Sequence, residues 1–149
     1  MPARHKKTAL ILVDHGSRLV AANDMLLQVV TLFKHMSGLP IVEPAHMEIA
    51  SPSLEEAFDR CVAQGATNII VYPYFLAPGR HSTGDIPRMV QTAAVRYPDV
   101  KIHVTPPLGL DEKITQVIWQ RVQQCLQAEM DCSKCPDQAC AQRKHPKPG

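Results

Sequence analysis

Three segments of this sequence carry side chains that could bind a metal ion or move a proton. His15 opens the first segment, residues 15–18. His46 and Glu48 stand two residues apart in the second, and His81 belongs to the third. Imidazoles with a carboxylate suit a borderline divalent metal such as Fe²⁺ or Co²⁺, and a neutral imidazole can also accept a proton near pH 7. These residue types indicate a metal site if the fold brings the segments together.

The elements that must position these residues alternate between strands and helices. Continuous apolar runs predict strands over residues 8–13, 40–50, 68–72 and 100–105. Apolar residues at helical spacing predict helices over residues 22–36, 52–65 and 84–97, and a last helix from about residue 111. Ser51 is the expected N-cap of the second helix. The pattern predicts an α/β fold, a parallel sheet of about four strands with helices on both faces.

Parallel sheets of this kind bind ligands beyond the carboxyl ends of their strands. The segments at residues 15–18, 46–50 and 75–85 all follow predicted strands, so we expect them on one rim of the sheet. Gly79 would let the backbone turn so that Arg80 and His81 point into a cleft. Asp85 is expected to cap the next helix.

Several of these residues also have an ordinary structural interpretation. His15 could be a loop histidine hydrogen-bonded to Asp14, and His46 a polar residue at a half-exposed strand end. Ser17 and Arg18 could grip a carboxylate or phosphate, because a guanidinium matches planar oxyanions. An exposed, solvated arginine is the commoner outcome.

The overall composition argues against several classes of protein. The net charge is only +2, and no basic run with interleaved aromatic residues indicates nucleic-acid binding. No apolar run approaches the roughly 20 residues that span a bilayer, and the first residues lack the apolar region of a signal peptide. We therefore expect a cytoplasmic protein, or a plastid-stromal one if a transit peptide has been removed.

Cysteines crowd the last quarter of the chain. Cys61 stands alone on a predicted helix and reads as a buried, inert thiol, whereas four others cluster at Cys125, Cys132, Cys135 and Cys140. A secreted disulfide scaffold would spread its cysteines along the chain, so the clustering favours an iron–sulfur cluster or a structural zinc. Cys125 could instead belong only to the apolar stripe of the last helix. We expect one domain over residues 8–127 and a Cys-rich tail over residues 128–149.

Over residues 9–124 the sequence resembles the short CbiX/SirB chelatases. Three motifs carry the resemblance, in the same order and register: His15-Gly-Ser-Arg18; Glu48 with Ala50-x-Pro52-Ser53; and Pro73-x-Phe75-Leu76-x-Pro78-Gly79-x-His81-x-x-x-Asp85-Ile86-Pro87. Residues 42–48 and the cysteine tail are most similar to plant-type sirohydrochlorin ferrochelatases.

The resemblance implies an enzyme that inserts Fe²⁺ into the tetrapyrrole sirohydrochlorin with loss of two pyrrole protons. It implies His15 and His81 as metal-binding residues, with Glu48 as a third ligand or proton acceptor. Many bacterial relatives carry an apolar residue where His46 stands, so His46 ranks below Glu48. Ser17, Arg18 and Arg80 are expected to hold the carboxylates of the macrocycle.

The resemblance also implies a homodimer of half-size, class II chelatase-like subunits. It further implies an iron–sulfur cluster on the four clustered cysteines, with [2Fe–2S] favoured and [4Fe–4S] possible. Three other functions remain open at this point: a cobaltochelatase of cobalamin synthesis, an iron–sulfur or metal carrier, and a small hydrolase using His15 and Ser17. The hydrolase lacks the Gly-x-Ser-x-Gly elbow that exposes a nucleophile.

Overall fold

The computed structural model describes residues 7–135, apart from the side chain of His81. The chain divides into two compact units between Gly109 and Leu110. The first unit contains the sheet, and the second contains the last helix of the predicted 8–127 domain.

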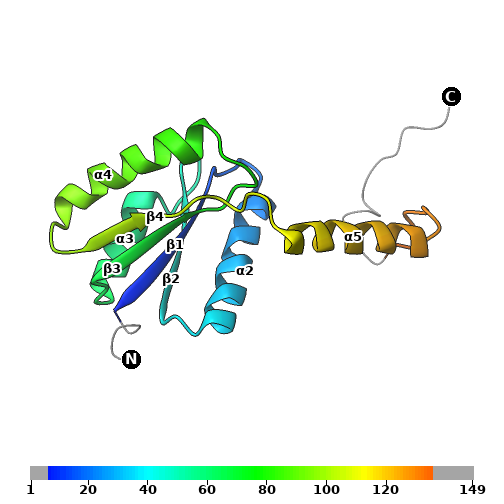
Figure 1. Cartoon of the computed structure of the whole chain (residues 1–149), viewed down its shortest axis with the longest axis horizontal. Coiled ribbons are helices and arrows are strands. Elements are labelled where there is room, and N and C mark those ends of the chain that lie inside the picture. The colour runs from blue at the N-terminus through cyan, green and yellow to red at the C-terminus, as the bar shows by residue number, and fades with distance from the viewer. Residues whose placement is uncertain (1–6, 136–149) are drawn as a thin grey trace. The chain divides into compact units, whose positions relative to one another are not determined.

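A parallel sheet forms the centre of the first unit, and in the described residues it has four strands in the order β2-β1-β3-β4 (Figure 1). The strands are β1 (Thr8–Asp14), β2 (Ile41–His46), β3 (Asn68–Pro73) and β4 (Lys101–Val104). β1 is an interior strand, paired with β2 on one side and β3 on the other. The predicted α/β fold is thereby confirmed. β2 ends at His46 rather than continuing to residue 50, because the chain turns at Ile49, where φ is +72°.

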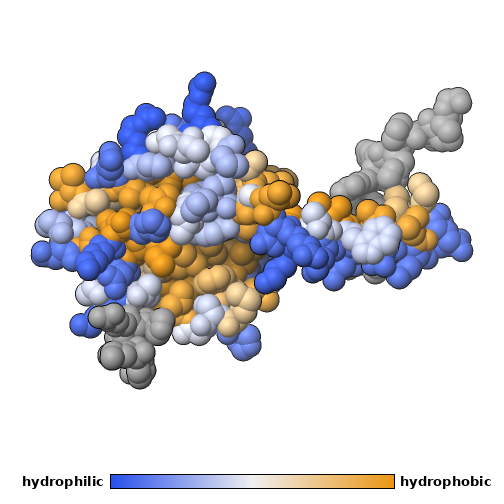
Figure 2. Space-filling model, in the orientation of Figure 1, coloured by the Kyte–Doolittle hydropathy of each residue, from blue (hydrophilic) through white to orange (hydrophobic). Residues whose placement is uncertain are grey.

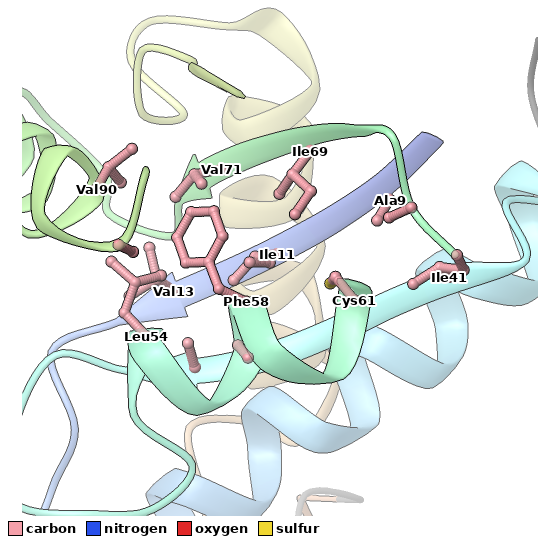
Figure 3. Close-up of a cluster of buried hydrophobic side chains, with 14 of the residues drawn as sticks. Ala9, Ile11, Val13, Ile41, Leu54, Phe58, Cys61, Ile69, Val71 and Val90 are labelled. Atoms are coloured by element: carbon pink, nitrogen blue, oxygen red, sulfur yellow. The ribbon is translucent and has the colours of Figure 1, made fainter. Parts of the chain in front are cut away.

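Helices cover both faces of the sheet, which is why the interior strands are apolar between their terminal residues. On one face, α2 (Val20–Ser37) packs Leu26 and Val30 against residues of β1 and β2. On the other, α3 (Leu54–Ala63) and α4 (Ile86–Arg96) enclose a larger core around Phe58, shown in Figure 3. These layers hold the strand ends in fixed positions beneath the loops that follow them.

The start of α3 differs from the prediction. Ser53 is the N-cap rather than Ser51, because its hydroxyl accepts a hydrogen bond from Glu56 N. The Glu56 carboxylate accepts in return from Ser53 N at 2.9 Å, which completes a capping box. Ser51 donates its hydroxyl to the same carboxylate. This bond, followed by the one from Ser53, lowers the pKa of Glu56.

The start of α4 also departs from the prediction in one respect. A π-helical turn, His81–Asp85, precedes the helix, and Pro87 lies in the first turn as predicted. Asp85 stands at the N-cap position but makes no capping bond. Its carboxylate instead pairs with Arg88 one turn later, at 3.0 Å.

The second unit is described by itself. It contains α5 (Glu112–Gln127), and the side chain of its N-cap residue, Asp111, accepts a hydrogen bond from Lys113 N. No residue within α5 is buried, and Val117, Ile118 and Val122 of the predicted apolar stripe are exposed. Figure 2 shows apolar and hydrophilic side chains gathered on different sides of this helix. None of the helices in the described part of the chain has the length and apolar character to cross a membrane.

Candidate active site

His15 and Glu48 meet at the carboxyl end of the sheet. His15 directly follows β1, and Glu48 lies two residues beyond β2. The Nε2 atom of His15 is 2.9 Å from Oε1 of Glu48. Both side chains remain accessible, with exposed fractions of 40% and 59%. The structure therefore brings together two of the predicted site residues where a ligand from solvent can reach them.

The geometry of this pair suits two ligands of one metal ion. Nitrogen and oxygen ligands bind ions of this class at about 2.1 Å, so two ligands at right angles stand about 3 Å apart. The Nδ1 atom of His15 lies 3.2 Å from the carbonyl oxygen of Gly16. When Nδ1 carries the ring proton and donates it there, the Nε2 lone pair is directed toward Glu48. A cation beside the pair would then meet a lone pair and a carboxylate together.

Gly16 allows the two loops to approach this closely. Its φ is +87°, and a Cβ atom at this position would stand 2.0 Å from the carbonyl oxygen of Glu48. Beyond the strands, Met47 N donates to Asp14 O at 2.9 Å and Glu48 N donates to His15 O at 3.2 Å. The backbone pairing of β1 and β2 thus continues into the site itself.

His46 lies beneath the site rather than in it. Its side chain is 1% exposed, and Nδ1 is 2.6 Å from Oδ1 of Asp14. The same Asp14 oxygen accepts a hydrogen bond from Gly16 N at 3.0 Å. The interpretation of His46 as a half-exposed residue at a strand end is therefore wrong. Its partner is 32 residues away in sequence, and no local pattern reveals that partner.

The end of the third predicted segment and the Glu48 loop line the same small pocket. Tyr74 N donates to Val13 O at 2.7 Å, which holds the segment beside the end of β1. The pocket has a volume of about 250 Å³ and is lined by Met47, Glu48, Asp85, Arg88 and Met89. Sequence reasoning did not assign Arg88 to the site, although its spacing of three residues from Asp85 on a helix was a usable signal. The side chain of the predicted ligand His81 lies outside the described residues, but its backbone begins the turn that ends at Asp85.

The residues predicted to bind substrate lie in the segments that follow β1 and β3. Arg18 and Arg80 are both exposed. Ser17 is held by Asn23, whose side chain accepts from Ser17 N at 2.9 Å and donates to Ser17 O at 2.7 Å. The hydroxyl oxygen of Ser17 accepts from Leu19 N. This oxygen supports the turn before α2.

The cysteines form no disulfide among the described residues. Cys125 is exposed, Cys132 and Cys135 are partly exposed, and Cys140 lies outside the described residues. Cys132 and Cys135 flank a turn in which Cys135 N donates to Cys132 O at 3.4 Å. Within the described range, no three His, Cys, Asp or Glu side chains are close enough to hold a metal. Cys61 is buried as predicted, and burial raises the pKa of its thiol to about 12.

The sequence model of the CbiX family matches residues 9–125, which is most of the chain. The chain belongs to the CbiX family. It is 46% identical over 127 residues to a chloroplastic sirohydrochlorin ferrochelatase of Arabidopsis thaliana, covering 85% of this chain and 56% of that protein. It is 34% identical to a sirohydrochlorin cobaltochelatase of Methanocaldococcus jannaschii, covering 76% of this chain and 96% of the relative.

A solved structure gives the same result. The fold matches the sirohydrochlorin chelatase SirB from Bacillus subtilis subspecies spizizenii, crystallised with cobalt, with a TM-score of 0.75 and 34% identity. The match covers 78% of this chain and 50% of SirB. The chain thus spans roughly half the length of the plant and Bacillus relatives of the CbiX family, and nearly all of the archaeal one.

Proposed function

We propose that this CbiX-family chain is a sirohydrochlorin ferrochelatase, which inserts Fe²⁺ into sirohydrochlorin to make siroheme. The observation that carries the proposal is the His15–Glu48 pair, 2.9 Å apart at the open end of the sheet and beside a pocket. Its separation fits adjacent ligands of one divalent ion. The name of the Arabidopsis relative, at 46% identity, supports iron as the metal.

In the proposed reaction Fe²⁺ replaces two pyrrole N–H protons, so two protons leave for each ion inserted. His15 Nε2 and the Glu48 carboxylate hold the incoming ion, with His81 as the third predicted ligand. As the ion passes to the macrocycle, the vacated lone pairs on His15 and Glu48 can each accept a proton. Arg18, Arg80 and Arg88 are exposed cations suited to the carboxylates of the substrate.

An anaerobic absorbance assay of sirohydrochlorin with Fe²⁺ tests the proposal. The wild-type protein should accelerate insertion, and His15→Ala or Glu48→Gln should reduce kcat/KM by at least about tenfold. Glu55→Gln is the matched control, because Glu55 is an exposed carboxylate that pairs with Arg96 on α4, outside the site. Full activity in both site variants would refute the assignment.

Cobalt insertion is the second candidate function. The archaeal relatives are named cobaltochelatases, and the SirB structure was obtained with cobalt. Because histidine and carboxylate ligands discriminate weakly between neighbouring divalent metals, the same site can serve either ion. A kcat/KM for Co²⁺ that exceeds the value for Fe²⁺ would assign the chain to the cobalt reaction.

We also propose a homodimer as the active form. The chain spans about half of the SirB chain, so two copies would supply the two halves of a complete cleft. The exposed apolar residues of α5 support association, since such a stripe is normally covered. Light scattering should give twice the mass of the chain, and a fully active monomer would contradict the dimer.

The cysteine tail is proposed to carry an iron–sulfur cluster. The thiol groups of Cys125, Cys132 and Cys135 form no disulfide and are the appropriate donors, and a turn already joins the last two. Anaerobically purified protein should be coloured and contain iron with acid-labile sulfide, and Cys132→Ser should lose both. Colourless protein with one equivalent of zinc would refute a cluster. Cluster transfer to an acceptor without tetrapyrrole binding would favour the carrier alternative.

A further inference from the structure

The strand ends beneath the His15–Glu48 pair contain a second, buried pair that the proposed reaction does not use. His46 is 1% exposed, and its Nδ1 lies 2.6 Å from Oδ1 of Asp14. A histidine enclosed in this way cannot reach an ion held by His15. Its contact with Asp14 must therefore serve the structure beneath the site rather than the metal directly.

The Asp14 carboxylate connects this buried pair to the turn that carries His15. Its Oδ1 accepts a hydrogen bond from Gly16 N at 3.0 Å, so the side chain of Asp14 folds back over the turn that follows it. This bond spans His15 and fixes the backbone on both sides of it. The adjacent bond from Met47 N to Asp14 O, at 2.9 Å, ties the same residue to the strand that leads to Glu48.

His46 determines where the Asp14 carboxylate stands. Without the imidazole donor, the carboxylate keeps the Gly16 N–H but loses its buried partner, and because it is 22% exposed it can tilt toward solvent. The His46 backbone is fixed separately, since its N–H donates to Pro52 O at 2.8 Å. His46 therefore offers a donor from a rigid position on the far side of the site loop.

We propose that the Asp14–His46 pair is a positioning device that sets the His15–Glu48 separation and so determines the affinity of the site for a divalent ion. His46 acts only through Asp14 and Gly16 and does not bind the metal. The proposal rests on the proposed function for its chemistry. Its central claim concerns metal binding alone, which can be measured without the tetrapyrrole.

The test compares two substitutions that differ in one hydrogen-bond donor. His46→Leu removes the hydrogen-bond donor and puts an apolar side chain of similar size in place of the imidazole. His46→Asn places an amide N–H close to the position of the imidazole Nδ1 and restores the bond to Asp14. Each variant is titrated with Co²⁺ alone, and visible absorption reports both the dissociation constant and the coordination of the ion.

We expect the Co²⁺ dissociation constant to rise about tenfold in His46→Leu, as is usual when a supporting hydrogen bond beneath a metal ligand is lost. His46→Asn should return it to within about twofold of wild type. Asp14→Ala combined with His46→Leu should be no worse than Asp14→Ala alone, because the two residues act as one unit. In turnover, KM for the metal should rise while KM for sirohydrochlorin stays constant.

If His46 had a purely structural role, its substitution would lower stability and leave Co²⁺ affinity unchanged. Tyr97→Phe is the control variant for that pattern. That change removes a hydrogen bond to Asp59 on the helical face and should lower stability without changing Co²⁺ affinity. Unchanged Co²⁺ affinity in His46→Leu, or equal weakening in the Leu and Asn variants, would overturn the positioning role. Wild-type protein that binds Co²⁺ but does not metallate sirohydrochlorin would refute the ferrochelatase proposal while leaving the positioning role intact.

Discussion

Replacing Gly16 by alanine would place a methyl group where the two site loops touch. The new Cβ would stand 2.0 Å from the carbonyl oxygen of Glu48 and 3.2 Å from Cβ of His46. The contact with the carbonyl is with backbone, so no side-chain rotation relieves it. The chain must therefore separate the His15 loop from the Glu48 loop or leave the left-handed conformation at residue 16.

The destabilisation has two parts that a matched control can separate. Gly65 has nearly the same φ, +89° against +87°, but a Cβ there meets nothing within 4 Å. Gly65→Ala should therefore show only the left-handed penalty, roughly 1–2 kcal/mol. Gly16→Ala should show that penalty and an overpacking term of about 1–3 kcal/mol. Its free energy of unfolding should thus fall by about 2–5 kcal/mol in total.

Urea unfolding measures the stabilities, and Co²⁺ titration with the sirohydrochlorin assay measures the site. Gly65→Ala should keep wild-type metal affinity and turnover, whereas Gly16→Ala should lose both even at temperatures where it is folded. Equal destabilisation by the two substitutions, together with normal turnover of Gly16→Ala, would refute the close approach of the two loops.

Three further predictions concern other residues of the chain. Arg88→Ala should raise KM for sirohydrochlorin by about tenfold, because one charge-assisted contact to a substrate carboxylate is lost. Co²⁺ affinity should stay unchanged. A change in Co²⁺ affinity would instead place Arg88 with the metal. Hydrogen bonds from the Tyr97 hydroxyl and then from Arg96 lower the pKa of Asp59 from its ordinary value of 3.8. The Tyr97–Asp59 contact therefore stabilises the fold at pH values above 3.8, and this stabilisation is lost as the pH falls through the lowered pKa. Tyr97→Phe should therefore lose stability at pH 6 and show a shallower decline in acid, and identical pH profiles would exclude the contact. Finally, Cys61, with its pKa raised to about 12, should resist a thiol reagent at pH 8 while exposed Cys125 reacts in cluster-free protein, as peptide mapping would show.

The sequence was sufficient for the features that depend on local pattern. Apolar runs over residues 8–13 and 40–50 predicted the first two strands, although the second ends four residues earlier in the structure, and the carboxyl-end rule then placed His15 and Glu48 on one rim. The exact cap of α3 was missed because Ser51 and Ser53 are both good capping residues. Only the geometry of Glu56 selects the second.

Features that depend on distant partners were not predictable in this way. The order β2-β1-β3-β4 follows from pairings between segments far apart in the chain, and no residue pattern within one strand specifies them. His46 reads as a polar residue in an apolar strand until Asp14 is known to face it. Arg88 becomes a site residue only because α4 begins beside the Glu48 loop.

The interior position of β1 also determines how rarely the backbone hydrogen bonds beside the site open. Amide protons of β1 are enclosed by neighbours on both sides, whereas β4 is an edge strand of four residues with Lys101 and His103 exposed. Hydrogen exchange should therefore be slowest in β1 and fastest in β4 among the four strands. His15 then stands at the tip of the most slowly exchanging segment of the sheet. If His15 binds the ion as proposed, the ion is held next to a strand whose backbone hydrogen bonds rarely open.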